Sequence, residues 1–242
     1  MIDREGGLDS IKYSLLSRDA ILAHMQAGNV AIDPFDSRNL GTASYDVTLG
    51  SHFFREQAPV TINPGFYSPW DRDHIRDVWG RPEYAERARM VFADSRTPVP
   101  EGIDPDDRVI IIRPQETVLC HTQEFIGGRN CVTTMMKARS SLGRNFIEIC
   151  KCAGWGDVGY INRWTMEVTN NSRYYAIPLV VGRRVAQIAF FQVDTFSGTD
   201  YVQEGKYQTE QDLERVKKEW LPHHMLPQMW KDWEVGESES DA

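Results

Sequence analysis

Hydrophobic positions along the 242-residue chain mostly follow the two-residue alternation of β-strands. Short runs rich in Val, Ile, Phe and Tyr are separated by Gly, Pro and Asn, a pattern typical of a β-sandwich or barrel with a few short helices. Strands are predicted at 30–35, 44–54, 109–112, 116–123, 131–136, 164–170 and 176–191, with turns at Gly127-Gly128 and Gly182. The pattern therefore predicts one mainly β domain over residues 1–242.

Helical patterns occur near the two ends of the chain. Ser17 is a suitable N-cap for a helix over 18–27, with Gly28 just past its end. Thr209 is a candidate N-cap for a second helix over 210–220. We predict an amino-terminal extension at 1–16, an insertion at 57–108 with helical character over 82–93, and a helical, acidic tail at 209–242 that is disordered from 234 on.

Composition narrows the classes of function. The sequence has no apolar run of 18 residues and no charged-then-apolar leader, so neither a membrane span nor a secretory signal is predicted. A net charge of −8 argues against general nucleic-acid binding, which needs a basic surface. Clustered arginines can still bind one mononucleotide. We expect a cytoplasmic protein without nucleic-acid or membrane partners.

The four cysteines are expected to be free thiols, because no leader directs the chain to an oxidising compartment. Cys150 and Cys152 would point to the same side of a strand. A zinc site is one interpretation, but no CxxC pair and no adjacent histidine support it, and small buried hydrophobes are the favoured alternative. His223 and His224 are either metal ligands or ordinary surface histidines.

The chemistry concentrates between Met136 and Asp194. Arg139, Ser140, Ser141 and Arg144 form a polar cluster whose guanidinium groups and hydroxyls suit a triphosphate. Asp157 lies in a glycine-rich turn, and Glu167 is a lone carboxylate in an apolar strand pattern. Together these features indicate a nucleotide site on a β scaffold.

This stretch resembles the dCTP deaminase branch of the dUTPase-like superfamily. ARSSLGR (138–144), AGWGDVGY (153–160) and TMEVTN (165–170) match the family's phosphate-binding, turn and catalytic-strand signatures. Residues 33–36, 43–50 and 205–208 match its outer segments in family order. The resemblance implies a distorted dUTPase-like β-barrel or jelly-roll, a homotrimer with shared active sites, and deamination of dCTP to dUTP and ammonia.

The resemblance also implies roles for individual residues. Glu167 would be the catalytic base, with Ser140 and Arg144 at the reacting end and Arg139 and Ser141 on the phosphates. Asp157 would hold the deoxyribose 3′-hydroxyl or a catalytic water. The remaining nucleotide contacts would come from Ala153, Thr165, Met166, Tyr201, Lys206, Tyr207 and Gln208, the last four on a segment that closes over the phosphates. Mg²⁺ would accompany the triphosphate, and dTTP is a candidate feedback ligand.

The residues themselves support a metal-independent base. Zinc deaminases carry H-x-E and P-C-x-x-C motifs, and neither occurs in this sequence. If Met166 and Val168 face the core, alternation places Glu167 on the opposite side of the strand, where partial desolvation would raise its pKa toward a useful range. Each candidate also has a structural alternative. Glu167 could be an ordinary exposed strand glutamate, and Asp157 could serve only its tight turn. The serines of the Arg/Ser cluster could be helix caps beside solvated arginines.

Three departures from the family pattern leave the product open. Cys150 and Gly154 stand where histidines are frequent in the family, and Gly156 stands where isoleucine is frequent. The glycine at 156 could loosen the turn that orients Asp157. Gly154 is also found in members that hydrolyse the triphosphate as well. The main expectation is dUTP. The alternatives are a bifunctional enzyme that gives dUMP and pyrophosphate, and a catalytically silent nucleotide-binding module. Asp46 is expected in a structural role, in a turn or on backbone groups.

Overall fold

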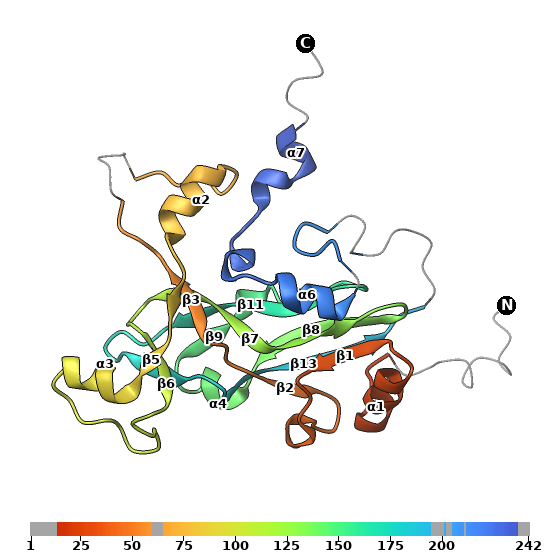
Figure 1. The fold of residues 1–242 in the computed structure, drawn as a ribbon, viewed down its shortest axis with the longest axis horizontal. Helices are drawn as coiled ribbons and strands as arrows, with labels where there is room; N and C mark the ends of the chain where they lie inside the picture. Colours follow the sequence, from red (N-terminus) through yellow and green to blue (C-terminus); the bar gives the residue numbers. More distant parts are fainter. Residues whose placement is uncertain (1–13, 60–64, 195–200, 202–204, 211, 237–242) are drawn as a thin grey trace, which may run out of the picture.

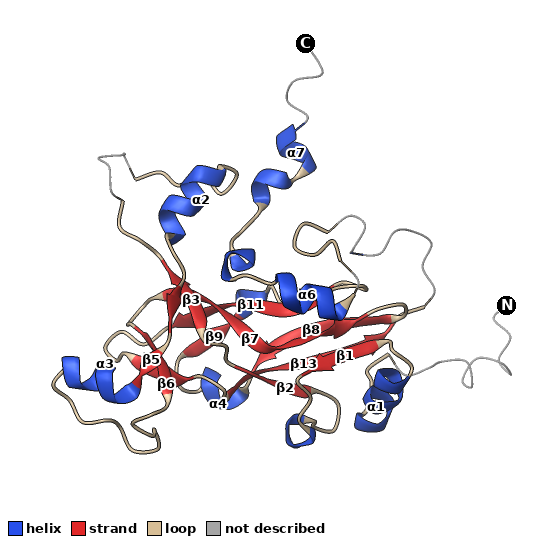
Figure 2. Ribbon diagram, in the orientation of Figure 1, coloured by secondary structure: helices blue, strands red, loops and turns tan. Residues whose placement is uncertain are grey.

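The computed structural model describes residues 14–59, 65–194, 201, 205–210 and 212–236. Its elements are mostly strands, and short helices lie around them (Figures 1 and 2). The strands are β1 Val30–Asp33, β2 Tyr45–Thr48, β3 His52–Arg55, β4 Glu83–Tyr84, β5 Glu86–Arg87, β6 Arg108–Ile112, β7 Thr117–Gly128, β8 Val132–Ala138, β9 Ile147–Ile149, β10 Trp155–Gly156, β11 Ile161–Asn170, β12 Ile177–Val180 and β13 Arg184–Gln192. The α-helices are α1 Arg18–Gln26, α2 Arg72–Trp79, α3 Ala88–Asp94, α4 Ser140–Gly143, α6 Leu213–Glu219 and α7 Trp233–Gly236, with 3₁₀ turns η1 Ser37–Asn39, η2 Cys150–Cys152, η3 Pro222–Met225 and η4 Met229–Lys231.

Three antiparallel sheets are built from these strands. The largest has the order β4-β3-β7-β11-β9, and β1 also pairs with β7. A second sheet has the order β10-β8-β13-β2, and a third β12-β6-β5. Side chains from the first two sheets share one buried core, for example Tyr45 of β2, Ile126 of β7, Met136 of β8, Met166 of β11 and Phe190 of β13. The prediction of a mainly β fold with short helices is confirmed.

Several local predictions are also confirmed. Helix α1 begins after Ser17, whose Oγ accepts a hydrogen bond from the Ala20 N–H, and it ends before Gly28 at φ +75°. The predicted strand 44–54 contains β2 and β3, which are separated at Gly50. A side chain there would lie 2.0 Å from the His121 ring, so this position must be glycine.

Two predicted boundaries are wrong. Gly127 and Gly128 do not form a turn but end the twelve-residue strand β7. Glycine is required at 127 because a Cβ there would lie 1.9 Å from the Tyr160 carbonyl oxygen. These glycines serve close strand packing. The helix expected over 210–220 begins only after Asp212, whose carboxylate accepts hydrogen bonds from the Glu214 and Arg215 N–H groups, so Thr209 is not its cap.

The carboxy-terminal segment, residues 212–236, covers one face of the largest sheet together with α2. Met225 and Trp220 pack against Leu119 of β7 and Phe54 of β3, and Trp79 of α2 joins this second cluster. Figure 1 shows α2, α6 and α7 on the same side of the sheet. The division into extension, insertion and tail stays a prediction. The expected extension lies largely outside the described residues, and so does the final stretch from 237. Residues 234–236, which were expected to be disordered, lie in α7 instead. No described helix is long and apolar enough to cross a bilayer.

Candidate active site

Glu167 lies near the middle of β11, with its neighbours in the positions that alternation predicts. Met166 and Val168 are fully buried in the core, while Glu167 is half-buried on the opposite face, paired with Leu119 of β7. Burial raises the pKa of Glu167 above its ordinary value, and the weaker effects of its own backbone N–H and of the Lys151 charge oppose the shift. A carboxylate whose affinity for a proton is raised by desolvation can accept one and return it near neutral pH.

A strained loop adjoins this carboxylate. Cys150, Lys151 and Cys152 have φ values of +67°, +37° and +69°, which β-carbon-bearing residues rarely adopt. Such conformations typically cost about 1–3 kcal/mol each and cluster at ligand and catalytic sites. The loop is coupled to Glu167, because burial and the Glu167 charge together raise the pKa of the Cys150 thiol to about 12.

The loop corrects one prediction and supports another. Cys150 and Cys152 do not share one side of a strand, because β9 ends at Ile149 and the left-handed residues turn the chain. Cys150 is buried with its Sγ 3.0 Å from the Met136 sulfur, as expected for a small hydrophobe, while Cys152 is exposed. All four cysteines are free, and the described residues hold no group of three His, Cys, Asp or Glu side chains able to bind a metal.

The Arg/Ser cluster lies on and around the short helix α4. Ser140, Ser141 and Arg144 are exposed, and among the described residues no carboxylate pairs with Arg144. Arg139 is fixed by Asp46 of β2, with Nε 3.4 Å from Oδ2, and Asp46 also pairs with Arg184 at 3.1 Å. Asp46 therefore lies in a strand and binds arginines, which corrects the expected turn or backbone role.

Two cavities border α4. A small one of about 370 Å³ lies between Gly143 and Cys150, so α4 and the strained loop adjoin. A larger one of about 1170 Å³ is lined by Arg139, Leu142 and the buried Glu124. Glu167 lines neither cavity. No hydrogen bond or ion pair between described residues joins Glu167 to the Arg/Ser cluster of its own chain.

Asp157 lies in a turn that follows β10. The strand pairs with Met135 and Thr134 of β8, and the Trp155 indole N–H donates to Asp157 Oδ1 at 3.1 Å. Gly156 does not loosen this turn. A Cβ there would lie 2.5 Å from the Trp164 ring and 2.4 Å from Thr134 Oγ1, so only glycine fits and the turn is tightly packed.

The segment around Lys206 packs on the same turn. The Tyr201 N–H donates to the Val158 carbonyl at 3.1 Å, and the Tyr201 ring meets Tyr160 edge-on. Gln208 is buried: its Oε1 accepts from the Ile161 N–H at 2.9 Å, and its Nε2 donates to the Gly159 and Glu210 carbonyls. Within one chain, the Gln208 amide is thus committed to holding this segment against the Asp157 turn.

Lys206 itself is engaged by the carboxy-terminal segment. Its Nζ forms an ion pair with the Asp232 carboxylate, and both side chains are mostly buried. The adjacent Tyr207 hydroxyl accepts a hydrogen bond from the Gln228 N–H. The sequence contains no motif that would have assigned Asp232 to this position.

The remaining predicted residues differ in accessibility. Ala153 is exposed at the end of the strained loop, and Thr165 is half-buried two positions from Glu167 on the same face of β11. Met166 is fully buried in the core, which leaves no side-chain atom for a nucleotide. The structure thus brings the candidates into three groups: Glu167 with the strained loop, the Arg/Ser cluster on α4, and the Asp157 turn with residues 201–208.

The model of the dCTP deaminase-like family matches residues 15–193, about three quarters of the chain. The chain belongs to the dCTP deaminase-like family. Its curated relatives include proteins of Methanobrevibacter smithii and Hydrogenobaculum sp., each named "dCTP deaminase, dUMP-forming". They are 28% and 27% identical to it, over 75% and 74% of this chain and 82% and 83% of theirs.

A solved deaminase structure has a similar fold. The crystal structure of 2′-deoxycytidine 5′-triphosphate deaminase from Agrobacterium tumefaciens superposes with a TM-score of 0.50 and 17% identity. The alignment covers 74% of this chain and about half, 48%, of that chain. In this dCTP deaminase-like chain, the family match ends before the 201–208 and carboxy-terminal segments, so the Lys206–Asp232 contact lies outside it.

Proposed function

We propose that the chain deaminates dCTP and also cleaves the triphosphate, releasing ammonia, dUMP and pyrophosphate. Glu167 carries the first half of this proposal, since it is a half-buried carboxylate of raised pKa at the family's catalytic-strand motif. The second half is supported by the names of the relatives, which are dUMP-forming deaminases. The dUMP product replaces dUTP as the favoured outcome.

The deamination step uses Glu167 as the base. Glu167 takes a proton from water, the oxygen adds to C4 of the cytosine ring, and the proton passes to the ring nitrogen and then to the leaving amine. Ammonia departs, and the proton of the new C4 hydroxyl passes through Glu167 to the ring nitrogen, which leaves the C4 carbonyl and the N3–H of uracil. Arg144 and Ser140 suit the charge that develops on the tetrahedral adduct. Arg144 presents a guanidinium with no carboxylate partner among the described residues, and Ser140 presents an exposed hydroxyl.

Cleavage of the triphosphate requires binding of its phosphates and a second water. Arg139, Ser141 and Lys206 are the candidate phosphate ligands, and Mg²⁺ enters as part of the nucleotide substrate. Asp157 is the candidate for positioning the deoxyribose or the attacking water, which would displace pyrophosphate from the α-phosphorus. Its exposure in a rigid turn supports this role.

No hydrogen bond or ion pair between described residues joins Glu167 to the Arg/Ser cluster of its own chain, and we propose that the site is shared between copies in a homotrimer. A closed, rotationally symmetric oligomer can place the Arg/Ser cluster of one copy against the β11 face of the next. The exposed Ser140, Ser141 and Arg144, free of carboxylate partners among the described residues, support this arrangement.

The test is incubation with dCTP and Mg²⁺, followed by chromatography that separates dCTP, dUTP and dUMP. Accumulation of dUMP with ammonia and pyrophosphate is the expected outcome. Accumulation of dUTP alone would show that the chain deaminates dCTP without cleaving the triphosphate. Tight dCTP binding without turnover would indicate a silent binding module and contradict the proposal.

A further inference from the structure

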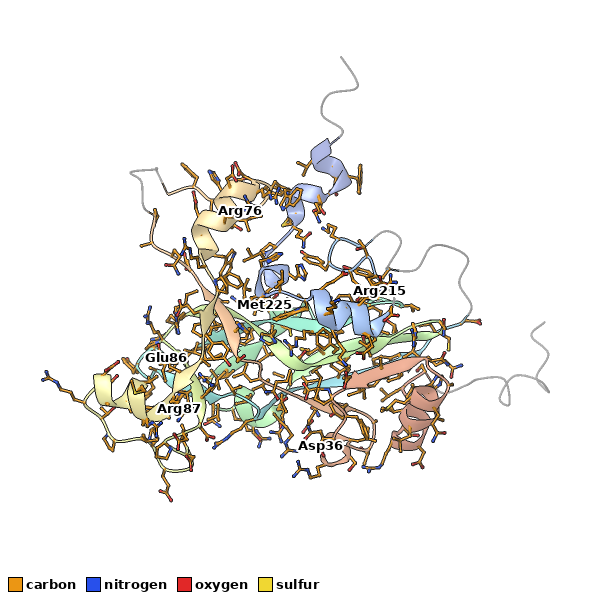
Figure 3. The ribbon with its side chains drawn as sticks, viewed as in Figure 1. Asp36, Arg76, Glu86, Arg87, Arg215 and Met225 are labelled. Atoms are coloured by element: carbon orange, nitrogen blue, oxygen red, sulfur yellow. The ribbon has the colours of Figure 1, made fainter. Side chains whose placement is uncertain are left out.

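A third cavity, of about 480 Å³, lies between α2 and the carboxy-terminal segment. Its volume is within the range of small-molecule pockets. The two walls belong together, because Trp79 of α2 packs in one hydrophobic cluster with Met225 and Leu226. Figure 3 labels Arg76 on α2 and Met225 on the carboxy-terminal segment, on the same side of the sheet.

The lining of this cavity is basic although the chain carries a net charge of −8. Its polar walls include Arg72, Arg76, His223, His224 and Lys231, and no Asp or Glu among the described residues lines it. Burial lowers the pKa of His224, the neighbouring His223 and Lys231 lower it further, and the Glu219 charge opposes them.

Two of these cations, both exposed, contact one aromatic ring and have no carboxylate partner among the described residues. The Arg72 guanidinium and the Lys231 ammonium lie 5.0 and 5.1 Å from the centre of the Trp230 ring, so one aromatic side chain fixes both. Within the described part of the chain neither has a carboxylate within 4.0 Å, and Arg76 has only Asp73 at 3.7 Å. Converging cations without counter-charges are suited to a phosphate group.

An uncharged group completes the cavity. The Gln228 Oε1 atom is buried without a hydrogen-bond partner among the described residues, and Gln228 lines both this cavity and the adjacent one beside Lys206. A buried polar atom without a partner is costly unless a ligand satisfies it. A carbonyl oxygen accepts a hydrogen bond, so its partner must offer an O–H or N–H group. A nucleoside phosphate can give its phosphate oxygens to the cations and still offer a sugar hydroxyl or a base N–H to this carbonyl.

We propose that this cavity binds a nucleoside phosphate, with the phosphate on Arg72 and Lys231 and a sugar hydroxyl or base N–H on Gln228. The site is distinct from the Glu167 face and does not depend on the reaction proposed above. It is built from α2 and the carboxy-terminal segment. The carboxy-terminal segment lies beyond residues 15–193, which the family model matches.

The experiment is calorimetric titration of the full chain with dUMP, inorganic phosphate or deoxyuridine. The variants are Arg72→Gln/Lys231→Gln and the matched control Arg96→Gln/Lys218→Gln, which removes two exposed cations that do not line this cavity. We expect dUMP to bind the first variant at least about tenfold more weakly at one class of site, since each charge-assisted hydrogen bond is worth more than a factor of ten. Binding to the control should be unchanged.

A second variant, Gln228→Leu, tests the nucleoside part. It should lower the affinity for dUMP toward that for inorganic phosphate, while thermal unfolding confirms that the chain is folded. Equal dUMP binding by the Arg72→Gln/Lys231→Gln variant and its control would overturn the site. Inorganic phosphate binding as tightly as dUMP to the unmodified chain would overturn the assignment of a nucleoside ligand.

Discussion

The carboxylate of Glu167 is the group on which the proposed chemistry depends at the scale of single residues. Glu167→Gln keeps its shape and removes proton transfer, which is typically worth about 10² to 10⁴ in rate. We expect deamination to fall by that factor while dCTP still binds, as measured by ammonia release and by titration. In the unmodified chain, kcat/KM should fall as the pH drops through the raised pKa of Glu167.

The same substitution has a predicted effect on stability. Because the pKa of Glu167 is higher in the folded than in the unfolded chain, the folded chain binds more protons between the two values. Stability contributed by this group is therefore present below the unfolded pKa and lost as the pH rises through the folded one. Glu167→Gln should raise the Tm at pH 7 and leave it nearly unchanged near pH 4. A lower Tm at pH 7 would contradict this account.

Gly156 offers a second test at the scale of one residue. Gly156→Ala would force a Cβ against Trp164 and Thr134, and overpacking of this kind typically costs about 1–3 kcal/mol. Gly143→Ala is the matched control, because nothing lies within 4 Å of its added Cβ and the residue is helical. Thermal unfolding should show a lower Tm for Gly156→Ala only. Equal Tm values would mean that the turn before Asp157 is loose.

At the scale of elements, the carboxy-terminal segment contacts residues expected to bind phosphate. Asp232 neutralises Lys206, and Gln228 donates to the Tyr207 hydroxyl. A triphosphate must therefore compete with the Asp232 carboxylate for the same ammonium group.

Asp232→Asn removes that competition. In the Glu167→Gln background, which prevents turnover, the substitution should tighten dCTP binding and leave deoxycytidine binding unchanged. Asp77→Asn, an exposed aspartate on α2, is the control. Weaker dCTP binding by Asp232→Asn would show instead that the ion pair holds Lys206 in its productive position.

At the scale of the whole molecule, the shared site predicts complementation between inactive chains. Glu167→Gln and Arg144→Ala should each be inactive alone. When the two are unfolded together and refolded, some interfaces receive both intact halves, so partial activity should return. The measurement is ammonia release after co-refolding, compared with folded chains that are mixed without exchange. Inactive mixed oligomers, or a fully active monomer in light scattering, would place the site within one chain.

The sequence by itself determined the elements whose signals are local. Alternation fixed the β class and the orientation of Glu167, because successive side chains of a strand point to opposite faces whatever the strand packs against. Ser17 and Gly28 marked the ends of α1, since capping uses only neighbouring backbone groups. The ordered motifs between residues 33 and 208 also pointed to the family that the comparisons found.

Only the tertiary structure decided features that depend on residues distant in the sequence. Gly127 packs on Tyr160, and Gly156 packs on Trp164. These glycines allow close packing and do not make loose turns, which becomes clear only once the strands are paired. The left-handed run at Cys150 contains no glycine and has no sequence signal. The Lys206–Asp232 ion pair joins residues 26 positions apart, and the choice of partner depends on where the chain folds back, which local propensities do not encode.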